Sequence, residues 1–77
     1  MLSTIWRVEP RYVLGNNIRA ARKEQDLTQE ALADKAGMHL VEVGRAERGA
    51  RDLRVSTVVK LARGLGVEAA ELLRGIK

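Results

Sequence analysis

The feature that most constrains this chain is a run of residues whose spacing predicts two short helices joined by a tight glycine turn. The run comprises Leu27–Ala33, then Gly37, and then Glu47-Arg48-Gly49. Thr28 is a favoured N-cap, because its hydroxyl can accept a hydrogen bond from a backbone N–H group that a helix start leaves unpaired. We therefore expect a helix from about Gln29, closed by Gly37 in the left-handed conformation.

A second short helix is predicted after this turn. Its apolar side consists of Met38, Val43 and Ala46. The remaining positions face outward or sideways near the start of the helix: His39, Leu40, Val41, Gly44 and Arg45. Since residues at such positions can reach base edges, this is the layout of a DNA-reading helix-turn-helix.

These residues resemble the phage-repressor-like (Xre/Cro-type) helix-turn-helix regulators, over the stretch from about Leu14 to Leu73. The shared motifs follow one another in the family's order: Ile18-Arg19 with Arg22, Leu27–Ala33, Gly37, Glu47-Arg48-Gly49, Leu61-Ala62, Leu65-Gly66-Val67 and Glu71-Leu72-Leu73. The resemblance implies an all-α, compact five-helix repressor-like DNA-binding domain. The short chain and the loop Arg51–Arg54 look like those of restriction–modification controllers, although antitoxins and phage regulators share the scaffold.

The segment Met1–Glu9 is predicted to be an N-terminal arm, and residues 10–77 the helix-turn-helix domain. The arm carries Trp6 and other apolar residues without helical spacing, and an edge strand is one conformation open to it. Pro10 suits a first helical position. The first helix should extend to Glu24, with a buried stripe at Leu14, Ile18 and Ala21.

Two further helices are expected, from Val55 to about Gly64–Gly66 and from about Glu68 to Leu73. Asp26 stands where relatives usually carry glycine, so we expect a left-handed or turn conformation there. Relatives often have serine at three helix starts where this chain has His39, Arg54 and Glu68. Each replacement removes a cap that contributes ~0.5–2 kcal/mol, so a marginally stable monomer is expected.

The composition limits the classes of function. A chain of 77 residues without cysteine and with one histidine offers neither a disulfide nor a zinc site, and we expect no cofactor. An enzyme is not expected, since His39 has no acid or nucleophile at a useful spacing and no glycine-rich phosphate loop occurs. With no apolar stretch long enough to span a membrane and no signal peptide, a cytoplasmic, nucleoid-associated protein is predicted.

The net charge of +4 favours a polyanionic partner, and double-stranded DNA is the partner we expect. Base reading is assigned to Gln29, His39, Leu40, Val41, Gly44 and Arg45. Arg45 is the strongest reader, because its guanidinium can bond O6 and N7 of guanine, which contributes ~1–3 kcal/mol of discrimination. A phosphate contact or a solvated charge is the alternative. Leu40 and Val41 can pack on thymine methyl groups or on another protein.

Phosphate binding is assigned to Thr28, Gln29, Arg48, Arg51 and Arg54. The last three continue from Arg45 at a spacing of three, which suits contact with a phosphate backbone but also describes a solvated face. Gln29 lies at a helix start, where N–H groups and the helix dipole favour anions. DNA phosphates would repel the carboxylate of Glu42. We therefore expect Glu42 to pair with Arg45, which lies three residues further along the helix.

The resemblance further implies a structural ion pair between Arg22 and Glu47. Apolar residues near the C-terminus exceed what one small domain needs, and a homodimer interface is predicted at Leu65, Val67, Leu72, Leu73 and Ile76, closure of the domain's own core being the alternative. The favoured function is a sequence-specific transcriptional regulator that binds a pseudo-palindromic operator and occludes or recruits RNA polymerase. The alternative is a protein-interaction module that keeps the fold but has lost base readout.

Overall fold

The computed structural model describes residues 9–77, which contain five α-helices and no strand. The helices are α2 (Pro10–Glu24), α3 (Gln29–Ala36), α4 (Leu40–Arg48), α5 (Val55–Leu65) and α6 (Ala69–Leu72). The all-α, five-helix fold expected from the sequence is confirmed. Trp6 and all of the predicted arm except Glu9 lie outside the described residues.

Local signals set the helix ends where the sequence predicted them. Pro10 is the first residue of α2, and the Thr28 hydroxyl accepts a hydrogen bond of 3.0 Å from the backbone N–H of Ala31. Gly37 closes α3 with φ 68°, and Asp26 is left-handed with φ 56°. Asp26 is the one residue other than glycine with positive φ among those described, so the turn between α2 and α3 has the predicted conformation at some steric cost.

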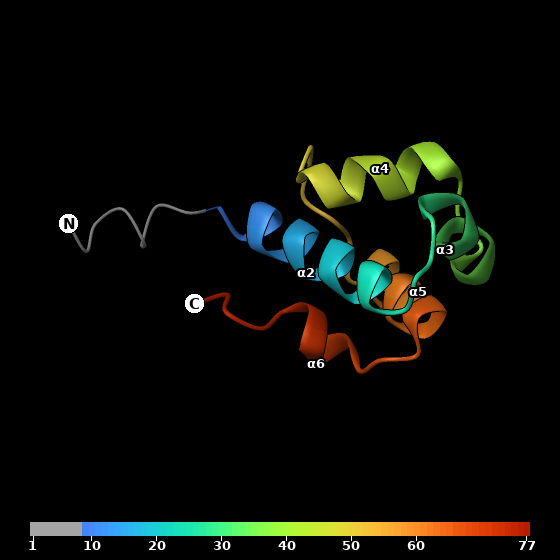
Figure 1. Ribbon diagram of the computed structural model, residues 1–77. Coiled ribbons are helices and arrows are strands. Elements are labelled where there is room, and N and C mark those ends of the chain that lie inside the picture. The colour runs from blue at the N-terminus through green and yellow to red at the C-terminus, as the bar shows by residue number, and fades with distance from the viewer. Residues whose placement is uncertain (1–8) are drawn as a thin grey trace.

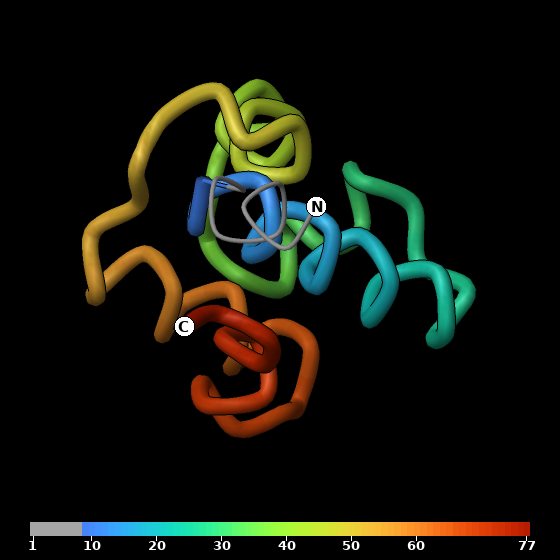
Figure 2. Tube along the Cα trace, turned by 90° about the vertical axis from the view of Figure 1, so that its left-hand side faces the viewer, coloured from blue at the N-terminus to red at the C-terminus, as the bar shows by residue number. Residues whose placement is uncertain are grey.

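The helices surround one hydrophobic core. Its most completely buried side chains are Ile18, Leu32, Leu61, Leu72 and Val43, contributed by all five helices. In both views α4 lies along one side of the molecule, while α6 and the C-terminus lie on the opposite side (Figures 1 and 2). The core therefore supports α4 from beneath and leaves its outer face free.

A close helix crossing holds α4 against α2. A Cβ atom added at Gly15 would lie 2.6 Å from the carbonyl oxygens of both Ala46 and Glu47. Such a distance is well inside van der Waals contact, so only glycine permits the two backbones to approach this closely. Gly15 thus sets how deeply α4 sits on the molecule.

Side-chain amides fasten the C-terminal elements. Asn17 donates hydrogen bonds of 2.8 Å to the carbonyl oxygens of Leu72 and Arg74, and Gln25 donates one of 2.6 Å to that of Leu65. The bonds to Leu72 and Leu65 satisfy carbonyl groups that the ends of α6 and α5 leave unpaired. The N-caps Arg54 and Glu68, in contrast, form no side-chain cap bond.

Candidate nucleic-acid interface

A buried ion pair fixes the position of α4 relative to its neighbours. Arg22 donates from Nε to Glu47 Oε2 at 2.6 Å and from Nη2 to Glu47 Oε1 at 3.0 Å. Its Nη1 donates to the carbonyl oxygen of Leu27 at 2.8 Å, so the guanidinium also holds the turn before α3. The hydrogen bond with Glu47 raises the pKa of Arg22, against the opposing effect of burial. The structure thus forms the ion pair that the family resemblance implied.

Gln29 joins this network. Its Nε2 donates to Glu47 Oε1 at 3.0 Å, which fixes the orientation of the half-buried amide. The carboxylate of Glu47 therefore accepts hydrogen bonds from side chains of both α2 and α3 while belonging to α4. Gln29 and the end of α4 are positioned as one unit.

The start of α4 is capped by an acidic side chain. His39 is the N-cap residue, and Glu42 Oε1 accepts a hydrogen bond of 3.0 Å from the backbone N–H of His39. The expected pairing of Glu42 with Arg45 is wrong: within residues 9–77 the salt bridge found joins Arg22 and Glu47. A backbone N–H at a helix start is a fixed donor within reach, and it satisfies the carboxylate at the positive end of the helix.

The outer face of α4 carries most of the expected base-reading residues. His39, Leu40, Val41 and Arg45 are exposed, and the two aliphatic side chains retain 46% and 59% of their accessible surface. Gly44 differs from expectation because it is buried. An added Cβ there would lie 3.2 Å from Nη1 of Arg48 and 3.7 Å from Oε1 of Gln29, so these two side chains lie beside it. Gly44 provides room for side chains of the interface rather than an open backbone surface.

The expected phosphate-binding arginines, Arg48, Arg51 and Arg54, follow Arg45 in the chain and are all exposed. Thr28 is exposed as well; its oxygen serves as the cap of α3, which leaves its O–H free to donate. A polar groove between α4 and α5 brings Arg45, Arg51 and Arg54 together with Lys60, and the acidic residues Glu42 and Asp52 line it too.

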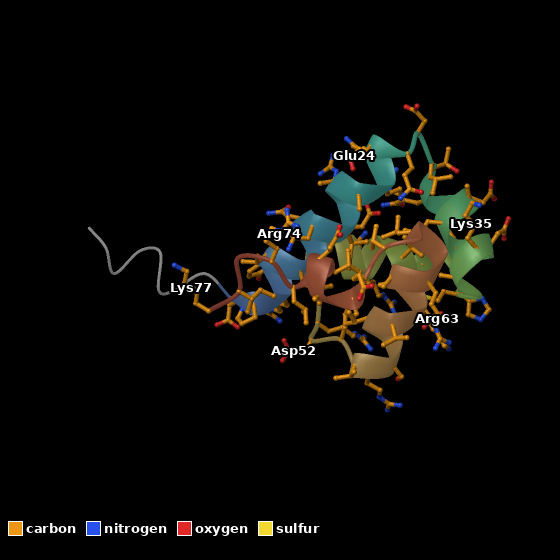
Figure 3. The ribbon with its side chains drawn as sticks, turned by 90° about the horizontal axis from the view of Figure 1, so that it is seen from below. Glu24, Lys35, Asp52, Arg63, Arg74 and Lys77 are labelled. Atoms are coloured by element: carbon orange, nitrogen blue, oxygen red, sulfur yellow. The ribbon has the colours of Figure 1, made fainter. Side chains whose placement is uncertain are left out.

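Lys60 was missed by reasoning from the sequence. The one local signal for it is an exposed charge beside the apolar stripe of α5, and that signal does not say which neighbour the lysine faces. Seen from below, the labelled side chains are of both signs and include Glu24, Lys35, Arg63 and Arg74 (Figure 3).

The predicted dimer residues separate into two groups. Leu65 and Leu72 are 3% and 1% exposed and belong to the protomer's own core, which corrects their assignment to an interface. They are buried because α6 folds back over α5, a contact that helical spacing does not reveal. Val67 and Ile76 are half-buried against the core, whereas Leu73 is 45% exposed. Leu73 lines an apolar groove together with Val55, which is 80% exposed.

Neither a metal site nor a membrane-spanning helix is found in the described part of the chain. No cluster of three or more histidine, cysteine, aspartate or glutamate side chains is placed to hold a metal ion. Likewise, none of the helices in residues 9–77 has the length and apolar character needed to cross a membrane.

The fold and the arrangement of α3 and α4 are those of a helix-turn-helix protein, and comparison with known proteins agrees. The family model described as helix-turn-helix matches residues 18–72, so the chain belongs to the helix-turn-helix family of DNA-binding transcriptional regulators. It is 36% identical over 67 residues to control protein C.SmaI of Serratia marcescens, which covers 84% of this chain and 80% of that protein.

Solved structures extend the similarity. The restriction–modification controller protein C.AhdI from Aeromonas hydrophila has a TM-score of 0.78 and 35% sequence identity, covering 80% of this chain and 94% of that one. The hypothetical transcription factor NHTF from Neisseria has a TM-score of 0.80 and 35% identity, covering 84% of this chain and 75% of that one. The family expected from the sequence motifs is confirmed.

Proposed function

We propose that this protein is a sequence-specific transcriptional regulator that binds a pseudo-palindromic DNA operator as a homodimer, with α4 in the major groove. The observation that carries the proposal is the exposed outer face of α4, where Arg45 lies one turn beyond Leu40 and Val41 and arginines continue along its edge. A helix held rigidly from beneath, with free side chains on its outer face, suits insertion into a groove.

Each group of residues has a separate role in this proposal. Arg45 reads a guanine through paired hydrogen bonds, and Leu40, Val41 and His39 contact neighbouring base edges. Arg48, Arg51 and Arg54 bind phosphates, joined by Thr28, Gln29 and by Lys60 from α5. Phosphate contacts position α4 and supply most of the salt-dependent affinity, whereas base contacts determine the sequence.

The homodimer is supported by the exposed apolar surface around Leu73. Together with Val55 and the half-buried Ile76, this side chain lines a groove that a second copy would cover. A chain of 77 residues builds a small core, so a dimer would add buried apolar surface that one protomer lacks. Two-fold symmetry would present two copies of α4 to half-sites one helical turn, about 34 Å, apart.

Similarity to C.SmaI and C.AhdI supports a narrower role, control of the genes of a restriction–modification system. In that role the bound dimer would occlude or recruit RNA polymerase.

The direct test compares Arg45→Ala with Arg63→Ala in fluorescence-anisotropy titrations of a selected operator. Both arginines are exposed, and Arg63 lies in the last turn of α5. Arg45→Ala should weaken binding by about 5- to 150-fold, and substitution of the guanine it reads should then cost little more. Equal effects of the two variants would show that Arg45 does not read a base.

A second function is favoured by one observation, the exposure of Leu40 and Val41 on α4. Apolar side chains at these positions would also suit a protein-interaction module that no longer reads DNA. The salt dependence of DNA binding distinguishes the two functions, because the affinity of a protein that binds DNA through several arginines falls steeply as the salt concentration increases. A chain that binds no DNA at low salt would establish the interaction module.

A further inference from the structure

The two apolar side chains on the first turn of α4 lie outside the hydrophobic core. Val43 and Ala46 of the same helix are 0% and 2% exposed, whereas Leu40 and Val41 retain about half of their surface. Their polar neighbour Glu42 is engaged with the backbone N–H of His39. The helix thus presents an apolar patch, formed by Leu40 and Val41, at the end that would enter the groove first.

We propose that this apolar patch recognises the C5-methyl group of pyrimidines in the major groove, and accepts thymine or 5-methylcytosine. The proposal rests on the proposed DNA-binding function and adds the chemical group that α4 selects. Leucine and valine form no side-chain hydrogen bonds, so they cannot read the donors and acceptors of a base edge. The methyl group of thymine is the one apolar feature that a base pair displays there.

Charge determines that the patch meets DNA rather than an apolar protein surface. Arg45, Arg48, Arg51 and Arg54 are exposed and lie on α4 or in the loop that follows it. A protein partner that covered Leu40 and Val41 would have to desolvate or neutralise several of these guanidinium groups. A nucleic-acid backbone provides phosphates on both sides of a groove, so the arginines and the apolar patch can be satisfied together.

The same apolar patch should also respond to methylated cytosine. Thymine and 5-methylcytosine carry their methyl group on the same ring carbon, C5, and present it in the same groove. A patch that gains affinity from one methyl should gain from the other, so methylation of a cytosine at the contacted position would strengthen binding. The modification state of the operator would then be read directly by α4.

The first experiment removes single methyl groups from the DNA. In a selected operator, each thymine is replaced in turn by deoxyuridine, which lacks only the methyl. At one or two positions per half-site the intact protein should bind about fourfold more weakly for each methyl lost, as expected for one buried CH₂-sized group. The loss should be absent in Leu40→Ala or Val41→Ala and retained in the matched variants Leu40→Met and Val41→Ile.

The second experiment adds a methyl at the same position. The thymine identified by the scan is replaced by cytosine and, in a matched duplex, by 5-methylcytosine. The methylated duplex should bind about fourfold more tightly than the unmethylated one, at low and high salt alike, since the contact is apolar.

Three results would overturn methyl recognition by the apolar patch while leaving a sequence-specific regulator in place. They are a selected half-site without thymine, deoxyuridine substitutions that leave the affinity unchanged, or the same loss of affinity on deoxyuridine substitution in the alanine variants as in the intact protein. Failure of the proposed function gives a different result, since binding would then show no preference for any sequence. Circular-dichroism melting checks that the variants are folded, which their exposed positions favour.

Discussion

At the scale of single residues, Glu47 connects the scaffold to the candidate interface. Its side chain is 3% exposed, and the carboxylate accepts hydrogen bonds from Arg22 and from Gln29. Removal of one partner from a buried ion pair leaves the other charge desolvated and uncompensated. The pair is therefore important for stability even though an apolar replacement of both partners could be neutral.

Glu47→Ala should destabilise the fold by about 3 kcal/mol, because it leaves the Arg22 guanidinium without its carboxylate. Thermal unfolding followed by circular dichroism measures the change. The matched control is Glu24→Ala, an exposed carboxylate in the last turn of α2, which should change stability by less than about 0.5 kcal/mol. Equal melting temperatures for the two variants would contradict a structural role for the ion pair.

Reasoning from the sequence succeeded at residues whose role is set by neighbours in the chain. Thr28 caps α3 and Gly37 closes it, because each needs only the backbone within one turn. The same reasoning was wrong for Glu42, which had both the N–H of His39 and the guanidinium of Arg45 within helical reach. His39 and Arg45 are each three residues from Glu42 in the sequence, so spacing alone does not determine which one is bonded.

At the scale of elements, the crossing of α2 and α4 determines where the outer face of α4 lies. Gly15 permits that crossing, since a Cβ atom would meet the carbonyl oxygens of Ala46 and Glu47. Sequence motifs did not reveal this role, because the residues that require the glycine lie some thirty positions away in the chain. For the same reason the sequence left open whether Leu65 and Leu72 belong to an interface or to the core, since their burial depends on how α6 packs on the other helices.

Gly15→Ala should destabilise the fold by about 1–3 kcal/mol and also weaken DNA binding, because α4 must move away from α2 to admit the methyl group. Thermal melting and anisotropy titration measure the two effects. Gly37→Asn is the control: nothing lies within 4 Å of an added Cβ there, and asparagine tolerates the left-handed conformation. Equal melting temperatures for Gly15→Ala and the wild type would show that the close crossing does not position α4.

At the scale of the whole molecule, the apolar groove around Leu73 is lined by no residue of α4. Arg45 and Arg48 belong to α4, whereas the groove is lined from α2, α5, α6, the C-terminal residues and the loop residues Asp52 and Leu53. Since α4 and α6 lie on opposite sides of the protomer, a dimer formed around Leu73 would leave the outer face of α4 uncovered (Figures 1 and 2). Such an arrangement allows association and DNA binding to occur together.

Leu73→Asp should shift the chain toward monomers, since a carboxylate in an apolar interface must be desolvated without a partner. Sedimentation equilibrium at several concentrations measures the dimer dissociation constant. Leu73→Met serves as the matched control, because it keeps the apolar contact at similar volume. The exposed position predicts that both variants fold, so an unchanged dissociation constant in Leu73→Asp would place the dimer interface elsewhere.

The most direct test of the proposed function is selection of bound duplexes from a random library, followed by anisotropy titration of the selected duplex against scrambled DNA at two salt concentrations. We predict an inverted repeat, bound at least ~10³-fold more tightly than scrambled DNA, with affinity for both falling as salt increases. Equal affinity for selected and scrambled DNA would contradict sequence-specific operator binding.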